Sequence, residues 1–153
     1  MSSQSDLFVL LPHTWRPLGV RLAVVFFGVL LAIVFVMAWV GFSQETRDSY
    51  TPFQLTTLGL LVLGGAGVGY GIARARVVAT EKGVVVVNGF RRHEAAWPEV
   101  QSIRLPSGAP WARMRLVDGR QISLTALQGS DGPRATRAVA QLAALVDARG
   151  ANS

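Results

Sequence analysis

Two long runs of apolar residues fill much of the first half of the sequence. Leu22 to Phe42 contains 21 residues without a charge, and as a helix it would extend about 32 Å at about 1.5 Å per residue. Ser49 to Ala73 is a second charge-free run of 25 residues, and Pro52 suits the first turn of a helix. The pattern predicts transmembrane helices at 22–42 and 53–73, an N-terminal segment at 1–21 and an external loop at 43–52.

From Arg74 the pattern changes to short runs of alternating apolar and polar residues. Val84 to Val87 is the strongest β-forming run, and Trp111 to Val117 alternates with period two. Asn88-Gly89 and Asp118-Gly119 are preferred hairpin turns. The pattern predicts six antiparallel strands, at residues 76–80, 84–87, 90–96, 100–105, 111–117 and 120–126.

The last part of the chain has helical spacing. Ala135, Val139, Leu142 and Val146 recur on one face, after the start signal Asp131-Gly132-Pro133. The expected fold is therefore a two-helix transmembrane hairpin followed by a small β-rich domain. That domain is expected at residues 74–150, with about six antiparallel strands capped by one C-terminal α-helix.

Composition limits the chemistry. The sequence has no cysteine and two histidines, which excludes disulfides, thiol chemistry and cysteine-ligated metals. No catalytic set of side chains is visible, so we expect neither an enzyme nor a cofactor or metal. The net charge is +6, and it all resides after Ala73, where twelve basic residues face six acidic ones.

Arginine placement predicts the topology. Arg16 and Arg21 precede the first span, and Arg74 and Arg76 follow the second, whereas the connector has one arginine and two acids. The positive-inside rule then predicts a multi-pass protein of the plasma (inner) membrane with both termini in the cytoplasm. Trp15, Trp39 and Tyr50 suit interfacial aromatic belts. An alternative reading is a cleaved signal peptide ending near Gly41-Phe42-Ser43.

Small residues mark faces for helix packing. Span one has Gly28 and Ala32 four residues apart, and span two has Gly65 and Gly69 at the same spacing. Measured from the flanking arginines, these pairs fall at similar depths in an antiparallel hairpin. We expect them to pack the two spans together; a homodimer through the glycine-rich second span is the alternative.

One segment carries a family resemblance. The segment Trp97-Pro98-Glu99-Val100-Gln101-Ser102-Ile103, followed by the Asp118-Gly119 hairpin, resembles bacterial PH-like domains. The similarity is to the actinobacterial family named for a low-molecular-weight protein antigen. It implies a PH-like fold in which Trp97, Glu99, Asp118 and Gly119 are fold-motif positions, and it implies no catalytic signature.

Arginines supply the candidate contact residues. Either they are solvated surface charge, or they face anionic lipid or a partner; the candidates are Arg74, Arg76, Arg91, Arg92, Arg113 and Arg115, with Trp111. The sequence thus predicts a membrane-anchored, non-enzymatic interaction module that binds a protein or peptide, helped by anionic lipid. The alternative is association with nucleic acid or the ribosome, against which the two spans and the single lysine weigh.

Overall fold

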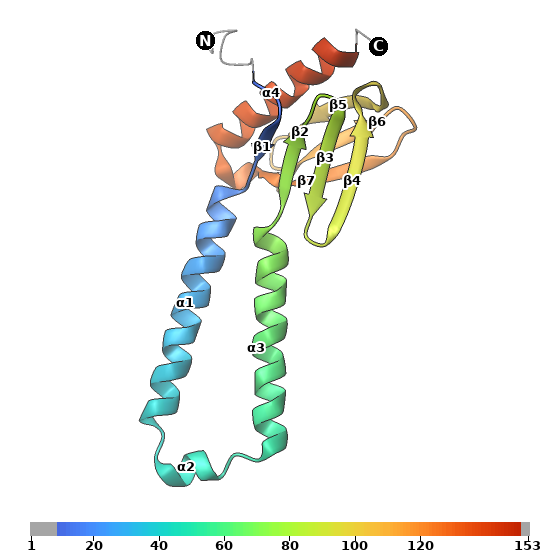
Figure 1. Ribbon diagram of the computed structural model, residues 1–153. Coiled ribbons are helices and arrows are strands. Elements are labelled where there is room, and N and C mark those ends of the chain that lie inside the picture. The colour runs from blue at the N-terminus through green and yellow to red at the C-terminus, as the bar shows by residue number, and fades with distance from the viewer. Residues whose placement is uncertain (1–8, 151–153) are drawn as a thin grey trace. The chain divides into compact units, whose positions relative to one another are not determined.

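The computed structural model describes residues 9–150 and divides the chain into two compact units (Figure 1). One unit runs from Val20 to Ala73 and is helical. The other joins the described residues up to Gly19 with those from Arg74 to Gly150. The second unit is therefore discontinuous in sequence, and the helical unit is an insertion within it.

The helical unit contains α1 (Leu18–Gly41), α2 (Gln44–Asp48) and α3 (Pro52–Ala73). Thr51 and Gln54 form a reciprocal capping box at the start of α3: the Thr51 N–H donates to Gln54 Oε1 at 2.9 Å, and the Gln54 N–H donates to Thr51 Oγ1 at 3.3 Å. Pro52 occupies the first helical position, where its missing N–H has no cost. These local signals explain why α3 begins one residue before the predicted span.

Most of the large apolar side chains of α1 and α3 are exposed. No residue of α1 is buried, and Gly71 is the buried residue of α3. By length and composition both are candidate membrane spans. At their adjoining ends, Arg21 Nε of α1 donates to the carbonyl oxygen of Ala73, the last residue of α3, at 2.9 Å. This bond places a cation on a helix C-terminus, where the dipole favours it.

Among the described residues of the other unit, seven antiparallel strands form two sheets. The first sheet has the order β1 (His13–Trp15), β2 (Arg76–Ala79), β3 (Gly83–Asn88), β4 (Arg91–Ala96). The second has the order β5 (Val100–Arg104), β6 (Trp111–Leu116), β7 (Gln121–Gln128). The six predicted strands and the fold class are confirmed, and β1 is a seventh strand that the sequence pattern did not indicate.

β1 corrects the expected domain boundaries. Trp15 lies opposite Val77, and His13 opposite Ala79, so the segment before α1 completes the sheet that resumes after α3. Trp15 is buried, and its Nε1 donates to Gln141 Oε1 at 3.3 Å. The prediction that Trp15 belongs to an interfacial belt was therefore wrong. Part of the predicted N-terminal segment at 1–21 belongs to the domain that was expected to begin at residue 74; residues 1–8 lie outside the described residues. Three residues are too few to show a period.

The hairpin turn predicted at Asn88-Gly89, between β3 and β4, lies one residue further along the chain. Asn88 pairs with Arg91, so Gly89 and Phe90 are the two turn residues, and Gly89 has φ 59°. The side chain of Asn88 instead joins the sheets. Its Nδ2 donates to the Ser123 carbonyl at 2.6 Å, and its Oδ1 accepts from Thr125 Oγ1 at 2.7 Å.

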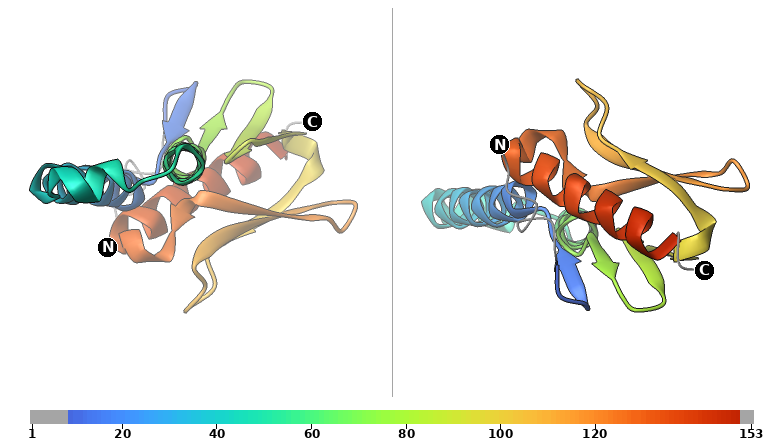
Figure 2. Two further views of the ribbon diagram at one scale, coloured as in Figure 1. Left: turned by 90° about the horizontal axis from the view of Figure 1, so that it is seen from below. Right: turned by 90° about the horizontal axis from the view of Figure 1, so that it is seen from above.

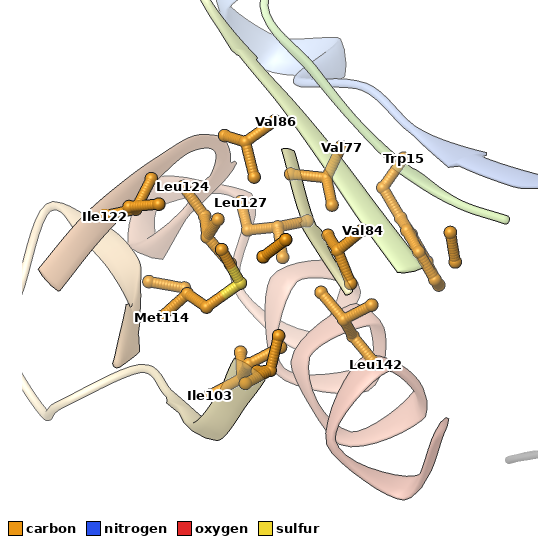
Figure 3. Close-up of a cluster of buried hydrophobic side chains, with 14 of the residues drawn as sticks. Trp15, Val77, Val84, Val86, Ile103, Met114, Ile122, Leu124, Leu127 and Leu142 are labelled. Atoms are coloured by element: carbon orange, nitrogen blue, oxygen red, sulfur yellow. The ribbon is translucent and has the colours of Figure 1, made fainter. Parts of the chain in front are cut away.

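The C-terminal helix α4 (Pro133–Gly150) packs on the two sheets (Figure 2). Its buried residues are Ala135, Ala138, Leu142 and Val146, while Val139 is partly buried. Figure 3 shows side chains from both sheets and from α4 gathered in one core, including Val84, Met114 and Leu142. The core therefore draws on elements from both sides of the inserted hairpin.

We expect Trp15→Ala to destabilise the domain by about 3 kcal/mol, because it empties a buried site and removes the bond to Gln141. The measurement is denaturant unfolding of the full chain in detergent, followed by circular dichroism. Trp111→Ala is the matched control, since Trp111 is 37% exposed. Equal losses from the two substitutions would show that β1 does not contribute to the core.

Candidate functional site: the arginines of the two sheets

Two of the fold-motif positions hold the junction between the sheets. Trp97 lies in a 3-10 helix, η2 (Trp97–Glu99); it is buried, and its Nε1 donates to the Thr80 carbonyl at 3.1 Å. Glu99 Oε2 accepts the Ala96 N–H at 2.8 Å and so fixes the turn from β4 into β5. Both side chains are engaged within the fold.

The other two fold-motif positions form the turn between β6 and β7. Asp118 accepts the backbone N–H of Arg120 at 2.9 Å and its Nε at 2.6 Å. These bonds hold the pKa of the Asp118 carboxyl below its usual value, the backbone bond most strongly. Gly119 has φ 85°, a conformation that glycine adopts readily. Asp118 therefore neutralises Arg120 locally.

The structure does not bring the predicted small-residue pairs together. A Cβ atom built on Gly69 would lie 3.3 Å from Val24 Cγ1 of α1, so α3 approaches α1 there. Cβ atoms built on Gly28 and Gly65 would meet nothing within 4 Å, and Ala32 is exposed. The bond from Arg21 to Ala73 fixes the contact near these helix ends, and a similar depth in the sequence did not specify which faces meet.

Four of the six arginines predicted as contacts lie in or next to the first sheet: Arg76 is in β2, Arg91 and Arg92 are neighbours in β4 and so project to opposite faces, and Arg74 precedes β2. Arg76 and Arg92 both lie opposite Val87, so they flank it across β2, β3 and β4. Arg92 is neutralised by Glu94, with Nη2 and Oε1 2.6 Å apart. Arg91 is exposed, and the Arg74 guanidinium lies 5.7 Å from the centre of the Phe90 ring. The positive charge of these four arginines is therefore partly offset by Glu94 and by the Phe90 ring.

The outer face of the second sheet carries three arginines together, which we call the arginine face: Arg104, Arg113 and Arg115. Arg104 of β5 lies directly opposite Arg113 of β6, and Arg115 lies opposite Ser102 and Gln121. With Gln101 and Pro106, these residues line an open hollow of about 430 Å³. Among the described residues, none of the three arginines forms an ion pair.

Arg104 was missing from the sequence-based candidates. Arg113 and Arg115 were recognised because they alternate with the apolar residues of β6. The signal for Arg104 was its position after Ile103, which is buried, on the strand that pairs with β6. Trp111, at the start of the same strand, lies opposite Gln128 and is 37% exposed.

The arginine face is electrostatically unfavourable on its own. Like charges directly opposite each other on neighbouring strands destabilise a sheet. Guanidinium groups offer planar pairs of donors that match carboxylate and phosphate oxygens. The arrangement therefore fits an anionic ligand. The part of the chain that the structure describes contains no group of three His, Cys, Asp or Glu side chains that could hold a metal.

Comparison with known proteins identifies the family. A family model described as bacterial PH domain matches residues 74–145. Uncharacterised proteins of Mycobacterium bovis and Mycobacterium tuberculosis are each 31% identical over 131 residues, which cover 86% of this chain and 82% of the relative. Residues 74–145 of the chain belong to the bacterial PH-domain family. The PH domain here also includes β1, which precedes the matched region.

The similarity to the mycobacterial proteins extends beyond the PH domain. From Arg74 to Ser153 there are 80 residues, so the 131 aligned residues must include at least 51 that precede Arg74. The relatives therefore share sequence with the helical unit as well as with the domain. No solved structure matches the chain.

We expect Arg104→Thr to stabilise the PH domain by about 0.2–1 kcal/mol at low salt, because it removes the charge opposite Arg113. Denaturant unfolding at increasing salt checks this, since screening should shrink the gain. Arg120→Thr is the control and should not stabilise, because Arg120 pairs with Asp118. A gain for Arg104→Thr that salt leaves unchanged would reflect strand propensity rather than charge.

Proposed function

We propose that this protein is a membrane-anchored, non-enzymatic module whose PH domain binds an acidic segment of a protein partner at the arginine face. The observation that supports this proposal most strongly is that Arg104 and Arg113 lie directly opposite each other, with Arg115 beside them. None of the three forms an ion pair with a described residue. The PH-domain family is associated with binding peptides and lipids rather than with catalysis. Anionic lipid assists by holding the domain near the bilayer.

A protein segment fits this face better than a nucleic acid does. Three arginines on two neighbouring strands form a compact group, whereas a nucleic acid backbone presents a long row of phosphates that basic residues follow. Among the described residues, β5 pairs with one strand, β6, and it also contacts α4, so its other edge has no strand partner within this part of the chain. An acidic extended peptide could add its backbone there and direct carboxylates to the guanidinium groups.

The strand β1 supports the membrane hairpin. The chain leaves the PH domain after β1 and returns to it at β2. Two strands of one sheet must lie on the same side of a membrane, so the helices between them cross an even number of times. With Arg16, Arg21, Arg74 and Arg76 flanking the helices, we place that side in the cytoplasm.

The same strand favours retention of the first helix. Cleavage near Gly41-Phe42-Ser43 would remove β1 and, with it, Trp15 from the core. If α1 and the residues before it were cleaved off as a signal peptide, the mature domain would lose a buried tryptophan and its core would be incomplete. The proposal therefore retains both helices as permanent spans.

The absence of cysteine allows the topology to be tested directly. We expect Gln44→Cys, in the connector, to react with a membrane-impermeant thiol reagent on intact cells. Ser107→Cys, in the loop between β5 and β6, should react after permeabilisation and not before. Labelling of Ser107→Cys on intact cells would place the PH domain outside and contradict the proposal.

Binding is tested with a fluorescent glutamate-rich peptide and the full chain in uncharged detergent. We expect Arg104→Gln, Arg113→Gln and Arg115→Gln together to weaken binding about tenfold, since each exposed ion pair contributes about 0.2–1 kcal/mol. The measurement is fluorescence anisotropy at low salt.

The matched control removes three charges elsewhere. Arg120→Gln, Arg134→Gln and Arg137→Gln change the net charge by the same amount, and these arginines are exposed outside the arginine face. Equal weakening by both triple variants would mean general electrostatic attraction and no site. A single-stranded oligonucleotide that binds more tightly than the peptide, through the same arginines, would favour the nucleic-acid alternative.

A further inference from the structure

Phe90 is unusually exposed for an aromatic residue of a PH domain this small. It is 71% exposed, whereas Trp111 is 37% exposed and both Trp15 and Trp97 are buried. Phe90 also lies in the two-residue turn between β3 and β4, outside the strand alternation. The inward and outward pattern of the sheet therefore does not account for a large apolar side chain at this position.

The surroundings of Phe90 are basic. The Arg74 guanidinium lies 5.7 Å from the centre of the Phe90 ring, within the range of a cation–π contact. Arg91 is exposed and follows Phe90 directly in the chain. Phe90 and Arg74 together offer an apolar ring and a cationic group at the tip of a turn. Groups of these two kinds suit the interface between membrane and water.

Chain connectivity sets the depth of this turn. Arg74 is the residue directly after Ala73, where α3 ends. If α3 crosses the bilayer, Arg74 lies at the level of the lipid headgroups, as basic residues flanking a span do. Phe90, in contact with Arg74, must then lie at that level too. The strand register agrees, because Arg76 pairs with Val87, two residues before Gly89.

We propose that the β3–β4 turn is a membrane contact of the PH domain. Phe90 enters the headgroup region of the anionic leaflet from which α3 emerges, while Arg74 and Arg91 contact lipid phosphates. This proposal rests on the membrane anchoring given under the proposed function. It uses the first sheet, whereas the partner site lies on the second, so one domain can contact lipid and protein at once.

The natural absence of cysteine again permits a direct test. The full chain carrying Phe90→Cys, labelled with an environment-sensitive fluorophore, is reconstituted into vesicles of phosphatidylcholine with phosphatidylglycerol. Brominated lipids serve as quenchers from within the bilayer, and iodide serves as a quencher from water. We expect several-fold stronger quenching by bromolipid, and several-fold weaker quenching by iodide, than at the control site.

Val117→Cys is the matched control. Val117 is an apolar residue 64% exposed beside another hairpin turn, the one between β6 and β7. A fluorophore at residue 90 that is as accessible to iodide as one at residue 117 overturns the proposal. Adding Arg91→Gln to Phe90→Cys should reduce bromolipid quenching in the anionic vesicles and leave it unchanged in pure phosphatidylcholine.

Two further measurements, vesicle flotation and peptide binding, distinguish failure of this proposal from failure of the proposed function. Vesicle flotation reports anchoring: a chain that does not float with lipid contradicts both proposals. A chain that floats and binds the glutamate-rich peptide, but leaves residue 90 in water, contradicts the lipid contact alone. Because labelling at residue 90 removes the native phenylalanine ring, the same fluorophore is also placed at residue 91 with Arg91→Cys, which keeps Phe90. In that labelled variant, the additional substitution Phe90→Ser should lower bromolipid quenching several-fold.

Discussion

The pairing of β1 with β2 is the constraint on which the rest of the structure depends. It joins Trp15 to Val77 across an inserted helical unit of more than fifty residues. Closing so long a loop has an entropic cost, although that cost grows slowly with length. Two antiparallel helices lower it, because the second returns the chain to the end from which the first started. The bond from Arg21 to Ala73 shows, within the helical unit alone, that the chain returns to its starting end.

This arrangement makes the fold of the PH domain depend on the helices. Trp15 enters the core that Val77, Val84 and Leu142 also line, so the segment from Arg74 onward lacks part of its own core. Pairing of β1 with β2 and pairing of the two helices therefore support each other. If both helices span a membrane, as the proposed function has it, the domain is tied to the bilayer at two points, which restricts its rotation more than a single tether would.

The sequence predicted the parts of the fold whose signals are local. Alternation along Trp111 to Val117 and the helical spacing of Leu142 and Val146 were sufficient, because each period is visible within one element. β1 was missed because three residues carry no period and its partner lies far along the chain. The turn was misplaced by one residue because Asn88 bonds to Ser123 and Thr125, a tertiary contact that overrides local turn preference.

The candidate site shows the same division between local and distant information. Arg113 and Arg115 were predicted from one strand, but Arg104 needed the register of β5 against β6. Helix packing depends on rotation about each axis, and spacing alone does not give this. Gly69 meets Val24 while Gly28 and Gly65 remain open. Side chains from different strands or helices that act together can therefore be identified only from the structure.

The two proposals assign different anionic ligands to the two sheets, and the distribution of charge differs between the sheets in the same way. On the first sheet, Glu94 neutralises Arg92, and Phe90 receives the Arg74 guanidinium. Attraction to an anionic leaflet is non-directional and needs no particular strand register. On the second sheet, Arg104 and Arg113 are opposed by that register, beside Arg115. General attraction to lipid does not require two arginines to lie directly opposite each other, whereas the proposed acidic partner would bind between them and offset their repulsion.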